Sequence, residues 1–175
     1  NEWDAICLNY TSGTTGNPKG VVYHHRGAFL NAMGDIAVWG LNSKTIYLWT
    51  LPMFHCNGWC FTWAVTAMGG THVCLRQIDT KQVFPMIRDL GINLVCGAPI
   101  ILNMLVHAPD EHKLSFPQKV NVYTGGAAPP SAVIAGMERM GFNVVHAYGL
   151  TETYGPSTYC AWQEDWADLN LEEKA

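Results

Sequence analysis

The chain contains few charged residues. Asp, Glu, Lys and Arg together make up 14% of its 175 residues, and the formal net charge is −4. This balance provides no broad basic surface, so we expect no nucleic-acid partner. No apolar run reaches the length of a membrane span, and we expect neither a transmembrane segment nor a signal peptide. An anionic small molecule would then be held by local hydrogen-bond donors and a metal ion.

A second pair of closely spaced metal ligands is also absent. The six cysteines lie at positions 7, 56, 60, 74, 96 and 160, several of them in apolar runs. This favours buried free thiols in a reducing compartment. His55, Cys56 and Cys60 are close enough in sequence to suggest zinc, but no second ligand pair follows at finger-like spacing. We therefore expect neither a zinc site nor a nucleophilic role for Cys56.

Glycine and hydroxyl residues are concentrated in one segment, YTSGTTGNPKG at positions 10–20. Glycine lets backbone N–H groups turn inward, and the hydroxyls of Thr11, Ser12, Thr14 and Thr15 add donors. Lys19 adds a mobile positive charge. Apolar runs flank the segment closely on both sides, which is atypical of a flexible linker. The composition therefore predicts a loop that binds a polyphosphate.

The segment lacks the pattern of a Walker-type P-loop. That pattern requires lysine directly after the last glycine and a hydroxyl residue after the lysine. Here Lys19 follows Pro18 and precedes Gly20. The G-x-G-x-x-G dinucleotide fingerprint is absent from this loop as well. We therefore do not expect a P-loop NTPase.

Alternating strand-like and helical patterns predict one layered α/β domain with a mostly parallel sheet flanked by helices. The hydrophobic content of 49% supports a sizeable core. The expected strands are 5–10, 20–24, 46–51, 71–75, 93–96, 119–124 and 143–148. The expected helices are 26–39, 58–68, 80–90, 99–107 and 130–140. Polar segments follow the strands that end near positions 10, 124 and 148. Ligands of open parallel sheets bind beyond the carboxyl ends of strands, so these three segments could line one crevice.

Four segments in order resemble one family. YTSGTTG resembles the phosphate-binding signature of adenylate-forming enzymes, which include acyl-CoA synthetases, luciferases and peptide-synthetase adenylation domains. LPMFHCNGW at 51–59, TGGAAPP at 124–130 and HAYGLTET at 146–153 resemble that superfamily's later motifs. The second and fourth are most similar to fatty-acyl and short- or medium-chain acyl-CoA synthetases. The resemblance covers most of the chain.

The resemblance implies ligands for ATP. Thr11, Ser12, Gly13, Thr14, Thr15 and Gly16 would surround the β- and γ-phosphates, and Lys19 would contact pyrophosphate. Thr151 would contact phosphate and Glu152 would bind Mg²⁺, although an acid in this position can also simply favour a helix N-terminus. The implied adenine and adenylate contacts are Gly126, Ala127, Ala128, His146, Ala147, Tyr148 and Gly149, with Tyr148 stacked on the base.

The resemblance also implies how a carboxylate would be bound. His55 corresponds to a residue that orients the substrate carboxylate toward the α-phosphate, whereas the other histidines are expected to be structural. Gly125 and Gly126 would let the acyl group lie against the backbone. Trp59 either shortens the acyl pocket, which suggests a short or medium chain, or simply packs in the core.

The implied activity is that of an AMP-forming acyl-CoA synthetase with ATP, Mg²⁺, a small carboxylate and coenzyme A. The alternatives are an aryl-CoA ligase, a luciferase-like enzyme, or a non-catalytic nucleotide-binding fragment. Amino-acid activation is disfavoured because no aspartate lies between Asp35 and Asp79. A homodimer of the full-length protein is compatible with the resemblance.

The superfamily's full chains continue into an aspartate motif, a hinge and a small lid domain with a second catalytic lysine, none of which is found here. We therefore expect residues 1–175 to be the central part of the N-terminal ATP- and acyl-binding domain, without the C-terminal lid domain. The isolated segment is expected to bind nucleotide weakly and to form little or no thioester. The expected location is cytoplasmic, with an organelle matrix such as the peroxisome as an alternative.

Overall fold

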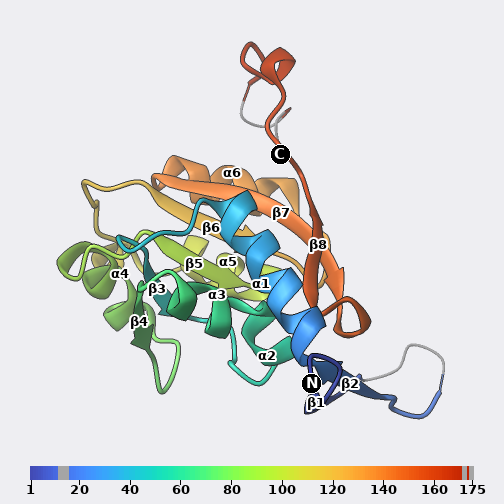
Figure 1. The fold of residues 1–175 in the computed structure, drawn as a ribbon. Coiled ribbons are helices and arrows are strands. Elements are labelled where there is room, and N and C mark those ends of the chain that lie inside the picture. The colour runs from blue at the N-terminus through green and yellow to red at the C-terminus, as the bar shows by residue number, and fades with distance from the viewer. Residues whose placement is uncertain (12–15, 171–172, 174–175) are drawn as a thin grey trace. The chain divides into compact units, whose positions relative to one another are not determined.

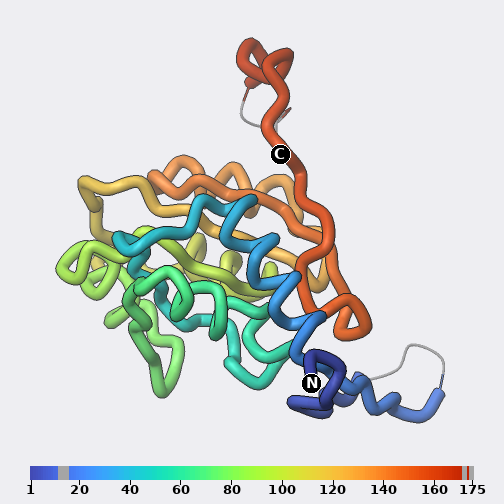
Figure 2. Tube along the Cα trace, in the orientation of Figure 1, coloured from blue at the N-terminus to red at the C-terminus, as the bar shows by residue number. Residues whose placement is uncertain are grey.

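The computed structural model describes residues 1–11, 16–170 and 173. The chain divides into two compact units. Figure 1 labels the helices and strands, and Figure 2 traces the same chain as a tube along the Cα atoms. Unit 1 comprises residues 1–45, 52–71 and 148–158. Unit 2 comprises residues 46–51, 72–147 and 159–175. None of the described helices is long and apolar enough to cross a bilayer.

Unit 1 begins with a two-stranded antiparallel sheet. Strand β1 (Ala5–Tyr10) pairs with β2 (Gly20–His24), and the register places Tyr10 opposite Gly20. The pairing is irregular between Ala5 and Cys7. Along β2 the exposure alternates, with Val22 57% exposed and Tyr23 fully buried. One face of β2 therefore belongs to the core of unit 1.

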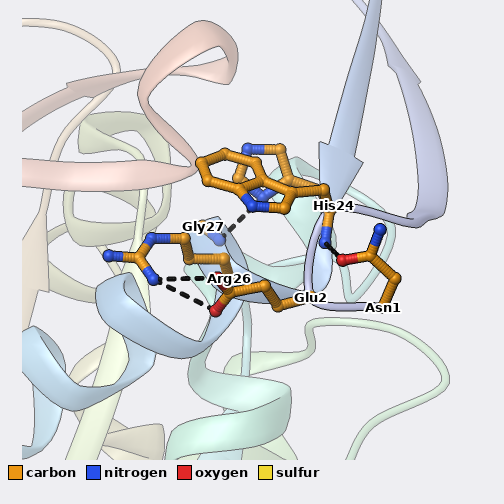
Figure 3. Close-up of polar contacts among 6 residues, drawn as sticks. Asn1, Glu2, His24, Arg26 and Gly27 are labelled. Atoms are coloured by element: carbon orange, nitrogen blue, oxygen red, sulfur yellow. Dashed lines mark hydrogen bonds and ion pairs between the residues drawn. The ribbon is translucent and has the colours of Figure 1, made fainter.

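Helix α1 (His25–Trp39) follows β2 directly and is capped at both ends. His24 is the N-cap residue, and its Nδ1 accepts a hydrogen bond of 2.9 Å from Gly27 N (Figure 3). Arg26 in the first turn pairs with Glu2 through two contacts of 3.0 and 3.1 Å (Figure 3). Gly40 ends the helix in the left-handed conformation, a position that glycine favours.

The chain between residues 56 and 60 is a left-handed turn, and we call it the left-handed turn below. Cys56, Asn57, Gly58, Trp59 and Cys60 all have φ between 45 and 64°. The short element α2 (Cys56–Trp59) lies within this turn, and right-handed helix α3 (Phe61–Ala67) begins after it. The expected single helix over 58–68 is therefore wrong at its start, because the backbone changes handedness there. Helix α3 packs against α1.

Unit 1 ends with residues that follow the middle of strand β7 (Phe142–Leu150). These are the last three residues of β7, a 3₁₀ turn η2 (Thr151–Thr153) and most of strand β8 (Gly155–Tyr159). Strand β8 is next to β7 in the sheet order. The sequence analysis did not predict β8, whose segment GPSTY contains glycine and proline and lacks an apolar alternation.

Unit 2 contains a mostly parallel sheet with the strand order β4-β3-β5-β6-β7. Parallel pairing joins β3 to β5, β5 to β6 and β6 to β7. The remaining strands are β3 (Ile46–Trp49), β4 (Thr71–Cys74), β5 (Leu94–Gly97) and β6 (Val120–Thr124). The helices are α4 (Thr80–Asp89), α5 (Pro99–Val106) and α6 (Ser131–Arg139), and 3₁₀ turns are η1 (Asp110–His112) and η3 (Glu164–Trp166).

The core of unit 2 lies between these strands and helices. Helices α5 and α6 pack against each other. The core includes Leu48, Ile87, Val122 and Met137, each fully buried. Strand β5 is buried at all four positions, as expected for a central strand of a parallel sheet covered by helices.

The predicted α/β class with a mostly parallel sheet is confirmed, but the expectation that the strand at 5–10 belongs to this sheet is wrong. Strand β1 lies in the separate antiparallel hairpin, not in the parallel sheet. The rule that ligands bind beyond the carboxyl ends of parallel strands therefore does not apply to the loop after β1. A nine-residue connection is too short for a parallel crossover and suits a hairpin.

Two helical glycines are expected to respond oppositely to alanine. A Cβ at Gly136 in α6 would lie 2.9 Å from Val106 Cγ1, whereas a Cβ at Gly34 in α1 would have no neighbour within 4 Å. We expect Gly34→Ala to raise the free energy of unfolding by about 0.5–1 kcal/mol through helix propensity. Gly136→Ala should lower it by about 1 kcal/mol, because overpacking exceeds that gain. Thermal denaturation of both variants checks this, and stabilisation by Gly136→Ala would contradict the packing argument.

Candidate functional site

The predicted site residues fall in both units, and each group is described within its own unit. Ser12, Gly13, Thr14 and Thr15 lie outside the described residues. Unit 1 contains Thr11, Gly16, Lys19, His55, Trp59, Tyr148, Gly149, Thr151 and Glu152. Unit 2 contains Gly125, Gly126, Ala127, Ala128, His146 and Ala147.

The two ends of the glycine- and threonine-rich segment are held together at the hairpin. Thr11 N donates to Lys19 O at 2.9 Å, and Lys19 N lies 3.4 Å from Thr11 Oγ1. These contacts extend the β1–β2 ladder by one residue on each strand. Lys19 is exposed and takes part in no ion pair among the described residues. The Lys19 ammonium is therefore available to an anion.

His55 stands at the start of the left-handed turn. Its backbone N donates to Pro52 O at 3.1 Å, and its carbonyl accepts from Gly58 N at 2.8 Å. The side chain is exposed, and the imidazole makes no hydrogen bond within the described part of the chain. The backbone of His55 is thus fixed by the turn, while its ring remains available to a ligand.

Contacts on two sides hold the left-handed turn. Asn57 Oδ1 accepts from Cys7 Sγ and from Asn9 Nδ2, each at 2.8 Å, which joins the turn to β1. Thr62 Oγ1 donates to Asn57 O at 2.9 Å. Each non-glycine residue in the left-handed region costs about 1–2 kcal/mol, with asparagine among the better tolerated. Asn57 is a residue that the sequence analysis missed, although asparagine beside glycine is a usable signal for this conformation.

Thr151 lies against the same turn. Its Oγ1 is 3.4 Å from Cys56 Sγ, and its carbonyl accepts from the hydroxyl of Tyr23 at 2.7 Å. The structure therefore brings Thr151 next to the residue that follows His55, as the motif order alone could not show. Tyr23 and Thr151 are 128 residues apart, so no local sequence signal could have identified Tyr23 as its support.

Tyr154 joins the end of this segment to α1 and β2. Its ring stacks on Tyr23 at a centroid distance of 4.0 Å, and its hydroxyl accepts from His24 N at 3.2 Å. A Cβ at Gly27 would overlap the Tyr154 ring, so the absence of a side chain there makes room for it. Tyr154 has φ of 70° and accepts at its carbonyl from Cys60 Sγ at 3.3 Å.

Glu152 and Tyr148 are exposed, and the chain between and beyond them makes a close backbone contact between Gly149 and Gly155. A Cβ at Gly149 would overlap the carbonyl group of Gly155, so only glycine fits there. Tyr148 is 57% exposed and presents its ring to solvent. Trp59 is 6% exposed and lies against Gly155.

Burial governs the ionisable groups behind the turn. Desolvation raises the pKa of the Cys60 thiol, and the nearby Asp35 and Cys56 add to this. Desolvation likewise raises the pKa values of Tyr23 and Cys7. These groups therefore stay neutral near pH 7 and act as hydrogen-bond donors. None of them resembles an activated nucleophile.

In unit 2, the glycine-rich segment and the H-A-Y segment lie at neighbouring strand ends. Thr124 at the end of β6 is paired with His146 on β7, so Gly125 and Ala147 follow at adjacent positions. Gly125 and Ala147 are buried, whereas Gly126, Ala127 and Ala128 are exposed. The Oγ1 of Thr124 is buried and has no hydrogen-bond partner in the described structure. These contacts bring the predicted adenine and acyl segments together within their unit.

The donor atoms around Glu152 suit Mg²⁺. Its carboxylate is exposed and forms no ion pair within the described residues, and Thr151 adjoins it with a hydroxyl oxygen. No cluster of three or more His, Cys, Asp or Glu side chains able to hold a metal occurs in residues 1–11, 16–170 and 173. A single carboxylate is consistent with Mg²⁺, which retains waters and binds substrate phosphates.

The left-handed turn should be sensitive to the residue at position 57. We expect Asn57→Ala to lower the free energy of unfolding by about 2 kcal/mol, because two donors lose their acceptor and alanine is strained there. Asn57→Gly loses the same acceptor without that strain and should cost about 1 kcal/mol less. Denaturant titration of both variants measures the difference. Equal losses would show that the backbone conformation contributes nothing.

Sequence relatives share nearly the whole chain. It is 52% identical to a peroxisomal acetate/butyrate–CoA ligase of Arabidopsis thaliana over 99% of its residues, and 54% identical to an acetate–CoA ligase of Humulus lupulus over 96%. It is 45% identical to a peroxisomal trans-cinnamate:CoA ligase of Petunia hybrida over 99%. The chain spans about 30% of the length of these relatives.

Solved structures share the fold. The N-terminal domain of FACL13 from Mycobacterium tuberculosis, bound to an inhibitor, matches with a TM-score of 0.82 and 31% identity over 90% of this chain and 39% of that one. The o-succinylbenzoate CoA synthetase of Bacillus subtilis, in complex with the acyl-adenylate OSB-AMP, matches with a TM-score of 0.78 and 26% identity. That match covers 88% of this chain and 31% of the synthetase.

The family model described as AMP-binding enzyme matches residues 1–173. The match includes all four segments that the sequence analysis identified, and it extends through both units of the structure. The chain therefore belongs to the family of AMP-binding enzymes.

Proposed function

We propose that the full-length protein is an acid–thiol ligase that forms acyl-CoA from a short-chain carboxylate, ATP and coenzyme A. The observation that carries this proposal is the close similarity to CoA ligases, at 45–54% identity over nearly the whole chain. Two of these three relatives act on acetate or on acetate and butyrate, by their names. The arrangement in unit 1 supports it, because Thr151 contacts the residue that follows His55.

In the first step, a carboxylate oxygen of the substrate attacks the α-phosphorus of ATP. The bond from that phosphorus to the oxygen bridging to the β-phosphate breaks, and pyrophosphate leaves. Both reactants are anions, so the site must position them and neutralise charge. We propose that His55 orients the carboxylate through its exposed imidazole, and that Lys19 and Thr11 contact the leaving phosphates.

Thr151 and Glu152 would act on the same phosphates. Tyr23 contacts the Thr151 carbonyl and Cys56 contacts its hydroxyl, and these contacts fix the backbone from which the next residue, Glu152, extends. Glu152 would hold Mg²⁺, which supplies charge neutralisation at the phosphate oxygens when bound.

In the second step, the thiol of coenzyme A attacks the acyl carbonyl of the adenylate. A carbon–sulfur bond forms, the bond from the acyl carbon to the AMP oxygen breaks, and the thiol proton passes to solvent. Ala127, Ala128, His146, Ala147, Tyr148 and Gly149 would contact adenine and the adenylate, and Gly125, Gly126 and Trp59 would line the acyl site.

We also propose that residues 1–175 are the central part of an N-terminal ATP- and acyl-binding domain. The similarity to the N-terminal domain of FACL13, of which the chain covers 39%, supports this. We propose a cytoplasmic location, with an organelle matrix such as the peroxisome as the alternative. Two of the relatives are named as peroxisomal, which supports the alternative. A homodimer of the full-length protein stays a prediction.

The first test replaces His55. We expect the His55→Ala variant of the full-length protein to lower kcat for acyl-CoA formation by about 100-fold or more, because the carboxylate loses its orienting contact. The measurement is thioester and AMP release with acetate, butyrate, hexanoate and cinnamate. His107→Ala is the matched control, because His107 bonds its own helix at Asn103 O. Wild-type turnover by His55→Ala would overturn the assigned role, and adenylate without thioester would overturn the ligase.

The second test replaces Glu152. We expect Glu152→Gln to raise the Mg²⁺ concentration needed for half-maximal pyrophosphate release by about tenfold or more, because a neutral amide binds the ion poorly. The folded state should be unaffected, since the side chain is exposed. Glu164→Gln, in the exposed turn η3, is the control. An unchanged Mg²⁺ dependence in Glu152→Gln would remove this residue from the metal site.

A further inference from the structure

Two buried oxygen atoms on one face of α1 have no hydrogen-bond partner among the residues that the structure describes. They are Asn31 Oδ1 and Asp35 Oδ2. The residues are four positions apart, so their side chains are neighbours on the helix surface. Asp35 is 3% exposed. Unpartnered buried polar atoms are rare in folded proteins, and two of them on side chains four residues apart in one helix require an explanation.

The other polar atoms of both side chains are already bonded. Asn31 Nδ2 donates to Pro156 O at 2.9 Å, which fixes the amide and directs Oδ1 elsewhere. Trp39 Nε1 donates to Asp35 Oδ1 at 3.1 Å, which leaves Oδ2. Both remaining atoms are acceptors when the carboxyl is ionised. They can bond to each other only if a proton lies between them.

We propose that Asp35 is a neutral carboxylic acid in the folded protein and that its Oδ2–H donates to Asn31 Oδ1. One proton then satisfies both buried atoms. The bond fixes the Asn31 amide, which in turn holds β8 at Pro156. Asp35 is thereby a positioning residue for the segment that carries Thr151 and Glu152, and this last consequence rests on the proposed function.

The surroundings of Asp35 favour the neutral form. Helix α3, which packs against α1, contains no ionisable side chain. The thiol of Cys60, directly before α3, has a raised pKa and is therefore neutral near pH 7. Strand β2 contributes Tyr23 and His24, and the unit 1 part of β8 contributes no charge. On α1 itself, His25 and Arg26 lie in the first turn, and Arg26 pairs with Glu2.

Burial is the main cause of the raised pKa of Asp35. Desolvation raises the pKa of Asp35 to about 8, although the hydrogen bond from Trp39 lowers it. An aspartate in the unfolded chain has a pKa near 3.8. The neutral acid therefore contributes its full stability below about pH 4, and that contribution is lost as the pH rises toward 8. Over this window the unfolding equilibrium constant increases by up to about tenfold per pH unit from this group.

The test is the pH dependence of unfolding of the full-length protein beside its Asp35→Asn variant. Asparagine keeps the shape, donates from Nδ2 to Asn31 and does not titrate. We expect the wild type to lose stability relative to Asp35→Asn as the pH rises from 5 to 8, by up to about tenfold in the unfolding constant per unit. Other titrating groups cancel in this comparison. Parallel pH curves would overturn the proposal.

A second measurement needs no folded variant. Infrared spectra of wild-type protein with ¹³C-labelled aspartate at pH 7 should contain the carbonyl band of a buried protonated carboxyl, and this band should disappear above about pH 9. Its absence at pH 7 would show an ionised Asp35, with a bound water or cation satisfying the two oxygens instead, and would overturn the proposal.

Activity gives a readout specific to positioning. At saturating substrate, the high-pH limb of kcat should lie at higher pH in Asp35→Asn than in the wild type, since the contact to Asn31 no longer depends on a proton. If the high-pH decline of kcat is the same in both proteins while their stabilities differ with pH, Asp35 has a structural role only, and its positioning role is overturned. Lack of ligase activity would instead concern the proposed function, because both other measurements are independent of catalysis.

Discussion

The left-handed turn at residues 56–60 is the constraint on which the rest of unit 1 depends. Four of its five residues carry side chains and adopt a conformation that such residues avoid. The turn persists because Asn57 is bonded to β1, Cys56 lies against Thr151 and Cys60 bonds Tyr154. The same contacts that compensate the backbone cost therefore fix the hairpin, His55 and the Thr151–Glu152 segment relative to one another. Backbone strain of this kind is typical of functional sites.

The regular elements were largely predictable from sequence. Continuous apolar runs such as LVCG and VNVYT, separated by helical patterns, were sufficient to predict the parallel sheet of unit 2. The features that the sequence did not predict depend on nonlocal pairing or on unusual backbone conformations. The pairing partner of β1, the change of handedness before α3 and the existence of β8 each depend on contacts that no periodicity encodes.

The candidate site shows the same division. The motifs predict which residues would contact a nucleotide and a carboxylate, and the family match covers all four motifs. The residues that support them were not predictable. Tyr23 donates a hydrogen bond to Thr151, 128 positions away. The buried oxygen atoms of Asn31 and Asp35 that lack a partner are identified only once the hydrogen bonds of their other polar atoms are known. Sequence patterns thus identify candidate ligands, whereas the tertiary structure shows what holds them.

The alternation along β2 has a consequence for how this chain can change in evolution. Tyr23 is buried and bonds Thr151, whereas its neighbour Val22 is exposed. Because strand side chains alternate with a period of two, one residue inserted between Gly20 and Tyr23 would turn the tyrosine to solvent if the pairing with β1 were kept. Insertions before Lys19 lengthen only the connection and preserve this parity. We expect natural length variation to collect before the lysine, so that the glycine- and threonine-rich segment can vary in length while strand β2 after it keeps a fixed number of residues.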